Sequence, residues 1–131
     1  MAAARSRDRH GRGMRGPLAW PRVPVMVSRR ERFDEAVLDA VAEFERRWGS
    51  PLPELEVAVQ DVPASDPHPW EQGVALGRLF PAERGARARM VIYRLPVEAR
   101  AADPSEVATV VHEVVVEQLA TMLGVDPEDF L

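Results

Sequence analysis

Five large apolar residues recur at intervals of three and four in one segment of the chain, which is the spacing of one face of an α-helix. These residues are Phe33, Val37, Val41, Phe44 and Trp48. Ser28 and Glu31 have the spacing of a capping box, and Gly49 followed by Pro51 is typical of a helix end. The pattern predicts an amphipathic helix over residues 28–48.

The middle of the chain carries strand patterns separated by a proline-rich loop. Residues 55–60 alternate with the period of a strand that is buried on one face. The buried set is expected to be Leu55, Val57 and Val59. Residues 90–95 predict a second strand bounded by Pro96, and residues 74–80 predict a short strand or turn. Residues 63–69 are expected to form a loop, and Trp70 beside it either fills the core or faces a partner.

A second long helix is expected near the end of the sequence. Asp103 can cap its first turn, Pro104 suits that turn, and Glu106 follows the cap at the spacing of a capping box. Gly124 is expected to end the helix, and another short helix is expected to start at Asp126. The apolar surface of the long helix comprises Val107, Val110, Val111, Val114, Val115, Leu119, Met122 and Leu123.

These elements predict one domain of the α+β class, with helices packed on a short mixed sheet. A chain of 131 residues leaves little sequence for a second core. Residues 1–27 mix Arg, Gly and Pro with few aliphatic residues, so we expect an extended arm that is disordered or lies along the surface. Residues 28–131 are expected to form the folded domain.

The formal net charge of -4 hides an uneven distribution. Residues 1–32 contain nine Arg and two acids, which gives +7, whereas residues 33–131 contain eight Arg and nineteen acids, which gives -11. A basic arm attracts phosphate groups, so weak nucleic-acid contact through the arm is one alternative function. The other interpretation of the arm is a solvated tail.

The composition of the chain limits where the protein is expected to be located in the cell and which residues could bind a metal. The chain has no apolar run of membrane-spanning length and no secretory signal pattern, so we expect a cytoplasmic protein without a membrane span. It has no Cys, which excludes disulfides and thiolate zinc sites. Any metal would therefore need His, Asp or Glu ligands, and the imidazoles are His10, His68 and His112.

The second helix contains a partial metal-binding pattern. A helix-borne zinc peptidase site uses imidazoles at positions i and i+4, with a Glu after the first that acts as base toward the metal-bound water. His112 and Glu113 fill the first two positions, but Val116 at i+4 cannot bind a metal. Glu117 at i+5 is rotated by roughly 140° from His112. The candidates are His112 as metal ligand and Glu113 as catalytic base, without a second imidazole.

The chain resembles the minimal zincin-like metallopeptidase family in the order of its elements over residues 28–131. The resemblance is carried by the first helix, the strand Leu-Glu-Val-Ala-Val-Gln-Asp, the proline-rich loop, Gly77-Arg78-Leu79-Phe80, the strand Met90-Val91-Ile92-Tyr93-Arg94 and the helix with Thr109-Val110-Val111-His112-Glu113. In that family the helix carries HExxH, then a Gly and an Asp that is the third ligand. The resemblance implies a small zincin-like domain, zinc as cofactor, a peptide or protein as partner, His112 as first ligand and Glu113 as general base.

The sequence departs from the family pattern in three places. Val116 replaces the second His, Leu119 the Gly and Met122 the acidic ligand. Gly124-Val125-Asp126 contains the Gly and Asp of the pattern, but about five residues later. The chain is similar to a branch of the family in which His-Glu-Val-Val-Val-Glu-Gln stands in place of the full motif.

Two interpretations of the function therefore remain open. One is zinc-dependent peptide hydrolysis at His112 and Glu113. The other is a non-catalytic descendant, a pseudoenzyme with a degenerate metal site that uses the same fold to bind a protein. The simpler interpretations of the residues are a locally hydrogen-bonded helix histidine for His112 and a solvated face for Glu113 and Glu117. His68 either completes a metal site from its loop or is an exposed loop residue.

Overall fold

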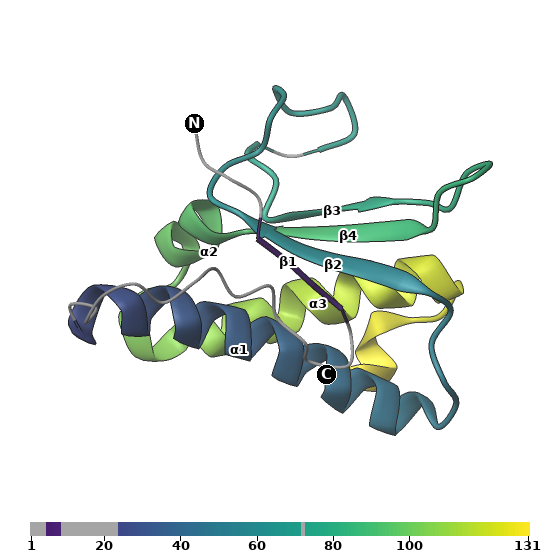
Figure 1. The fold of residues 1–131 in the computed structure, drawn as a ribbon, viewed down its shortest axis with the longest axis horizontal. Coiled ribbons are helices and arrows are strands. Elements are labelled where there is room, and N and C mark those ends of the chain that lie inside the picture. Colours follow the sequence, from purple (N-terminus) through teal and green to yellow (C-terminus); the bar gives the residue numbers. More distant parts are fainter. Residues whose placement is uncertain (1–4, 9–23, 72) are drawn as a thin grey trace.

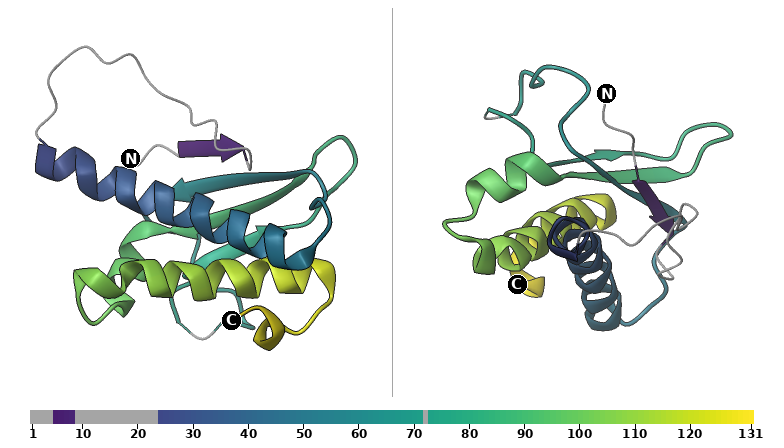
Figure 2. Two further views of the ribbon diagram at one scale, coloured as in Figure 1. Left: turned by 90° about the horizontal axis from the view of Figure 1, so that it is seen from below. Right: turned by 60° about the vertical axis from the view of Figure 1, so that its left-hand side comes forward.

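A computed structural model describes residues 5–8, 24–71 and 73–131. Two long helices, α1 (Pro24–Trp48) and α3 (Val107–Leu123), cover one face of a four-stranded sheet (Figures 1 and 2). The fold is therefore α+β, with helices packed on a mixed sheet, which confirms the predicted class.

The strand order of the sheet is β1-β2-β4-β3. These strands are β1 (Arg5–Asp8), β2 (Leu55–Gln60), β3 (Gly77–Phe80) and β4 (Ala88–Tyr93). The two central strands, β2 and β4, are parallel, whereas β1 and β3 run antiparallel to their neighbours. The edge of β3 that faces away from β4 pairs with no other strand of the described residues.

The predicted end of the second strand is wrong. The strand stops at Tyr93, and the chain turns directly into a short helix, α2 (Arg94–Arg100). Pro96 is the third residue of α2, a position whose amide has no partner inside a helix. Proline is therefore compatible with the first turn, and it marks the start of a helix rather than the end of a strand.

The predicted start of the first helix is also wrong. α1 begins at Pro24, so Ser28 lies inside the helix instead of capping it. Proline suits the first helical position because its missing amide hydrogen is not needed there. Of the predicted arm over residues 1–27, the structure describes residues 5–8, which form β1, and residues 24–27, which belong to α1.

The last helix forms as the sequence predicts. Asp103 caps a 3-10 turn, η1 (Pro104–Glu106), by accepting a hydrogen bond from the amide two residues later at 2.8 Å, and η1 leads into α3. Gly124 follows α3 with φ 70°, a left-handed conformation that favours glycine. A second 3-10 turn, η2 (Pro127–Phe130), forms where the short helix was expected.

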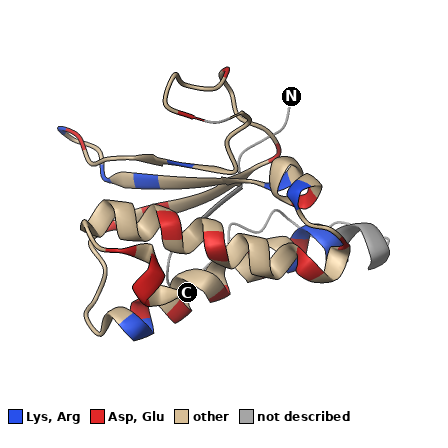
Figure 3. Cartoon of the chain, turned by 180° about the vertical axis from the view of Figure 1, so that it is seen from behind, with Lys and Arg blue, Asp and Glu red and all other residues tan. Residues whose placement is uncertain are grey.

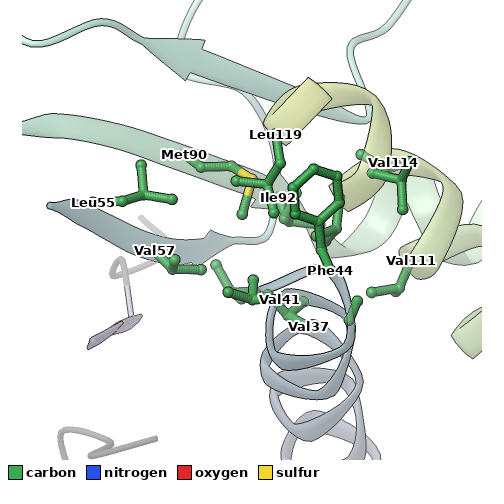
Figure 4. Close-up of a cluster of buried hydrophobic side chains, with 14 of the residues drawn as sticks. Val37, Val41, Phe44, Leu55, Val57, Met90, Ile92, Val111, Val114 and Leu119 are labelled. Atoms are coloured by element: carbon green, nitrogen blue, oxygen red, sulfur yellow. The ribbon is translucent and has the colours of Figure 1, made fainter. Parts of the chain in front are cut away.

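The main core lies between the two long helices and the covered face of the sheet (Figure 4). α1 contributes the predicted stripe, with Trp48 only partly buried. The other large buried side chains include Leu55, Val57, Met90, Ile92, Val111, Val115 and Leu119. A smaller cluster on the opposite face comprises Ala58, Ala75, Val91 and Tyr93. β4 is therefore buried on both faces, as expected for a central strand.

Among the described residues, no helix combines the length and the apolar character needed to cross a lipid bilayer.

Replacement of Leu119 tests how strongly α3 is held in this core. Leu119 is 0% exposed, so Leu119→Ala should lower the free energy of unfolding by about 2–5 kcal/mol through lost apolar burial and a cavity. The matched control is Leu95→Ala on α2, where the side chain is 43% exposed and the expected loss is about 1 kcal/mol or less. Urea denaturation followed by circular dichroism measures both, and equal losses would contradict the assigned core.

Candidate functional site

His112 is half-buried on the side of α3 that faces α1. It lines a hollow of about 410 Å³ together with acidic residues of α1, namely Glu35, Asp39 and Glu43. Glu113, the neighbouring residue on α3, is exposed to solvent. The acids of α1 belong to a wider distribution of negative charge along α1, α3 and η2 (Figure 3).

This environment does not fit a helix-borne zinc site. Val116, one turn after His112, is 0% exposed and belongs to the core. His68 lines a different cavity. Within the part of the chain that the structure describes, no three His, Asp or Glu side chains are grouped so that they could hold a metal ion. Among the described residues, His112 thus belongs to no group of three side chains that could hold a metal ion.

A larger cavity of about 680 Å³ lies on another side of α3, beside β3. α3 lines it with Val114, Glu117, Gln118 and Thr121. The other walls are β3 with the residues that precede it, the loop around Trp70, and Arg100 of α2. Because successive residues of a helix are rotated by roughly 100°, His112 points away from this set of four side chains. We call this cavity the β3 cleft.

β3 and α3 approach each other closely at Gly77. A Cβ atom at this position would lie 2.9 Å from Cγ1 of Val114 and 3.2 Å from the carbonyl oxygen of Val91. Nε2 of Gln118 lies 3.5 Å from the carbonyl oxygen of Gly77, at the outer limit of a hydrogen bond. The missing side chain at Gly77 therefore lets the helix reach the edge strand.

The outer edge of β3 exposes backbone hydrogen-bonding groups. The amide of Tyr93 donates to the carbonyl oxygen of Leu76 at 2.9 Å, and Gly77 lies opposite Ile92. In an antiparallel ladder this arrangement makes Gly77 and Ile92 a non-hydrogen-bonded pair. Gly77 and Leu79 consequently direct their N–H and C=O groups away from β4, toward the β3 cleft.

The loop before β3 is fastened to the strand by one buried guanidinium. Nε and Nη2 of Arg78 bind the two carboxylate oxygens of Glu71 at 3.1 and 3.0 Å. Nη1 donates to Oγ of Ser65 at 2.9 Å, and Nη2 donates to the carbonyl oxygen of Asp66 at 3.2 Å. The hydrogen bonds from Arg78, with a further one from the amide of His68, lower the pKa of Glu71 from 4.5 to about 2.

The fastened loop carries a stacked aromatic pair. The rings of His68 and Trp70 are stacked, with centroids 4.5 Å apart and planes 16° from parallel. Trp70 is 77% exposed, so the prediction that it could fill the core is wrong. Val74 is 62% exposed and Phe80 is 43% exposed, and both line the same cleft. One rim of the β3 cleft is therefore apolar.

The elements around this cleft define a class of domain in which a long helix lies beside the free edge strand of a mixed sheet. Residues 52–130 match the zincin-like metallopeptidase family, and this match covers more than half of the chain. The chain belongs to that family. The match includes β2, β3, β4 and α3 and begins after α1. A comparison with curated proteins finds no match.

The sequence analysis singled out His112 and Glu113 and missed most of the residues that line the β3 cleft. Glu117 was considered as a replacement metal ligand, with a rotation from His112 that does not suit that role, and as part of a solvated face, whereas Gln118 and Thr121 were not considered. The helical spacing of Val114, Glu117, Gln118 and Thr121 was available as a signal, because these positions share one face. The missing information was which face of α3 lies beside the edge strand.

The bond between Arg78 and Glu71 should make the stability depend on pH. The pKa of Glu71 in the fold is lower than its ordinary value of 4.5, so the ion pair stabilises the fold fully above that value. The contribution is lost as the pH falls from 4.5 toward 2. Glu71→Gln should therefore lower the melting temperature at pH 7, and its difference from the wild type should shrink in acid. Glu128→Gln, at an exposed carboxylate on η2, is the control. If the difference in melting temperature between Glu71→Gln and the wild type does not change with pH, the ion pair does not stabilise the fold as assigned.

Proposed function

We propose that this zincin-like domain binds an extended segment of a peptide or protein in the β3 cleft and does not hydrolyse it with a zinc ion at His112. The observation that carries the proposal is the lining of the cleft. The face of α3 next to the free edge strand contains Glu117, Gln118 and Thr121, and His112 lies on another face.

The position of Gly124 supports this assignment of the helix face. In the family pattern a Gly follows the first His of HExxH by seven residues. Counting back seven positions from Gly124, which ends α3, gives Glu117 for the first His, Gln118 for the Glu and Thr121 for the second His. These three residues line the β3 cleft. This count supports the proposal that the motif position lies in the β3 cleft, with Glu, Gln and Thr in place of the three functional side chains of HExxH.

The replaced side chains are suited to binding a peptide without reacting with it. A Glu carboxylate accepts hydrogen bonds, a Gln amide donates and accepts them, and a Thr hydroxyl does both. None of them supplies the imidazole pair that a zinc site of this type needs. The chemistry that remains in the cleft is reversible hydrogen bonding, with the amide of Gly77 and the backbone groups of Leu79 on the facing wall, while the carbonyl oxygen of Gly77 accepts from Gln118.

The free edge of β3 favours a peptide over a small molecule as the ligand. An exposed strand edge can bind a further strand through backbone hydrogen bonds, and pockets beside it then select alternate side chains. The β3 cleft has both parts, because the edge is bordered by α3 on one side and by the loop with Trp70 on the other. An extended peptide can occupy the full length of such a cleft.

Metal analysis tests the part of the proposal that concerns His112. Protein exposed to zinc and then dialysed should retain far less than one zinc ion per chain, and His112→Ala should retain the same amount. Inductively coupled plasma mass spectrometry gives both values. Stoichiometric zinc that disappears in His112→Ala would overturn the proposal in favour of a zinc site at His112.

Filling the cleft tests peptide binding. Thr121→Trp places a large side chain in the β3 cleft and should weaken the binding of an extended peptide at least about tenfold, because the bulky ring occupies the ligand's volume. Thr109→Trp is the matched control, since Thr109 is also an exposed Thr of α3 but does not line the cleft. Fluorescence anisotropy of a labelled peptide measures binding, and equal effects of the two variants would place the ligand elsewhere.

A further inference from the structure

We infer that the β3 cleft selects a strand whose side chains alternate between its two walls, with a basic side chain toward Glu117 of α3 and apolar side chains toward the loop. The inference rests on the proposed function and names the ligand class of the same site.

The alternation follows from the two sides of β3. Leu79 packs with the main core, and Gly77 adjoins Val114 of α3, so these two positions face the helices. Arg78 and Phe80 face the opposite side, where Arg78 holds the loop. Successive side chains of a strand point to opposite faces, and an added strand continues the faces of its neighbour. Alternate side chains of the ligand therefore meet α3 and the loop in turn.

The side of the cleft formed by α3 carries one negative charge. Glu117 is exposed and makes no ion pair with another described residue, while Val114, Gln118 and Thr121 of the same wall are uncharged. A Lys or Arg side chain that faces α3 can pair with Glu117. The excess of acids over Arg in residues 33–131 adds a longer-range attraction for a basic ligand.

The side of the cleft formed by the loop has no unpaired charge comparable to that of Glu117. Its two charged residues, Arg78 and Glu71, are bound to each other. The exposed groups there are the indole of Trp70 and the side chains of Val74 and Phe80. Apolar ligand side chains would cover these groups and release the water around them. A charged side chain in the same place would lose hydration without gaining a partner.

Arg100 favours one of the two directions in which a bound strand could run along β3. It lines the cleft from α2, which follows β4 immediately and so lies at the Gly77 end of β3. Its guanidinium is exposed and makes no ion pair within the described parts of the chain. A strand that runs antiparallel to β3 brings its carboxyl-terminal end to this position. Arg100 can then pair with a terminal carboxylate or an acidic residue.

The test uses short peptides of one composition and one net charge. In the first peptide Lys and Val alternate and the carboxyl terminus is free, and in the second the same residues are grouped in two blocks. The alternating peptide should bind the full-length protein more tightly, by about fivefold, which is the upper range for one exposed ion pair. The matched composition removes general attraction to the acidic domain as an explanation.

Two variants test whether Glu117 causes the preference for the alternating peptide. Glu117→Gln keeps the shape of the side chain and removes its charge, so it should abolish the difference between the two peptides. Glu35→Gln removes an equal charge from an exposed position on α1 outside the β3 cleft, and the difference should persist. Isothermal titration calorimetry measures the six affinities, which are those of two peptides for the wild type and for each variant.

The possible outcomes separate this inference from the proposed function. Equal binding of both peptides, or a preference that survives in Glu117→Gln, overturns the alternating ligand but leaves peptide binding in the cleft intact. Failure of every peptide to bind, including an uncharged Thr and Val peptide, overturns both. If the protein self-associates and Thr121→Trp abolishes this association, a second copy of the chain occupies the β3 cleft. That result would also overturn the inference.

Discussion

The burial of α3 determines what each of its side chains can do. Val111, Val115, Val116 and Leu119 are fully buried, and together they hold the helix between α1 and the sheet. A rotation of α3 by one residue, roughly 100°, would move such side chains toward water at a cost of about 1.5–3 kcal/mol each. The helix therefore cannot turn His112 to the edge strand. Its packing fixes one face for α1, one for the sheet, one for solvent and one for the β3 cleft.

The family membership and the chemistry of the cleft rest on different residues. The family match spans residues 52–130, which include β2, β3, β4 and α3, and fold alone does not determine function. Side chains in the cleft such as Glu117 and Thr121 can change without disturbing the core, because both are exposed on the surface of α3. A pair such as His112 and Glu113 can in turn resemble a catalytic motif in sequence while lying away from the edge strand.

Local patterns in the sequence were sufficient for most of the fold. The stripe on α1, the alternation in β2 and the caps of α3 each depend on neighbours within one element, and all were predicted. Pro96 and Ser28 were misjudged because proline and serine are compatible with more than one position in a helix or at its ends. The β3 cleft depends on how α3 is rotated against β3 and on how Arg78 holds the loop. These are contacts between distant segments, for which a single sequence contains no direct signal.

The two outer strands of the sheet, β1 and β3, are both short. Each has four residues, whereas the central strands β2 and β4 have six. A sheet with long, open edges can add copies of itself without limit, which leads to fibres. A short edge strand offers few backbone groups to another copy of the sheet. The longer strands, β2 and β4, are covered on both sides by neighbours, so they are kept from open-ended assembly.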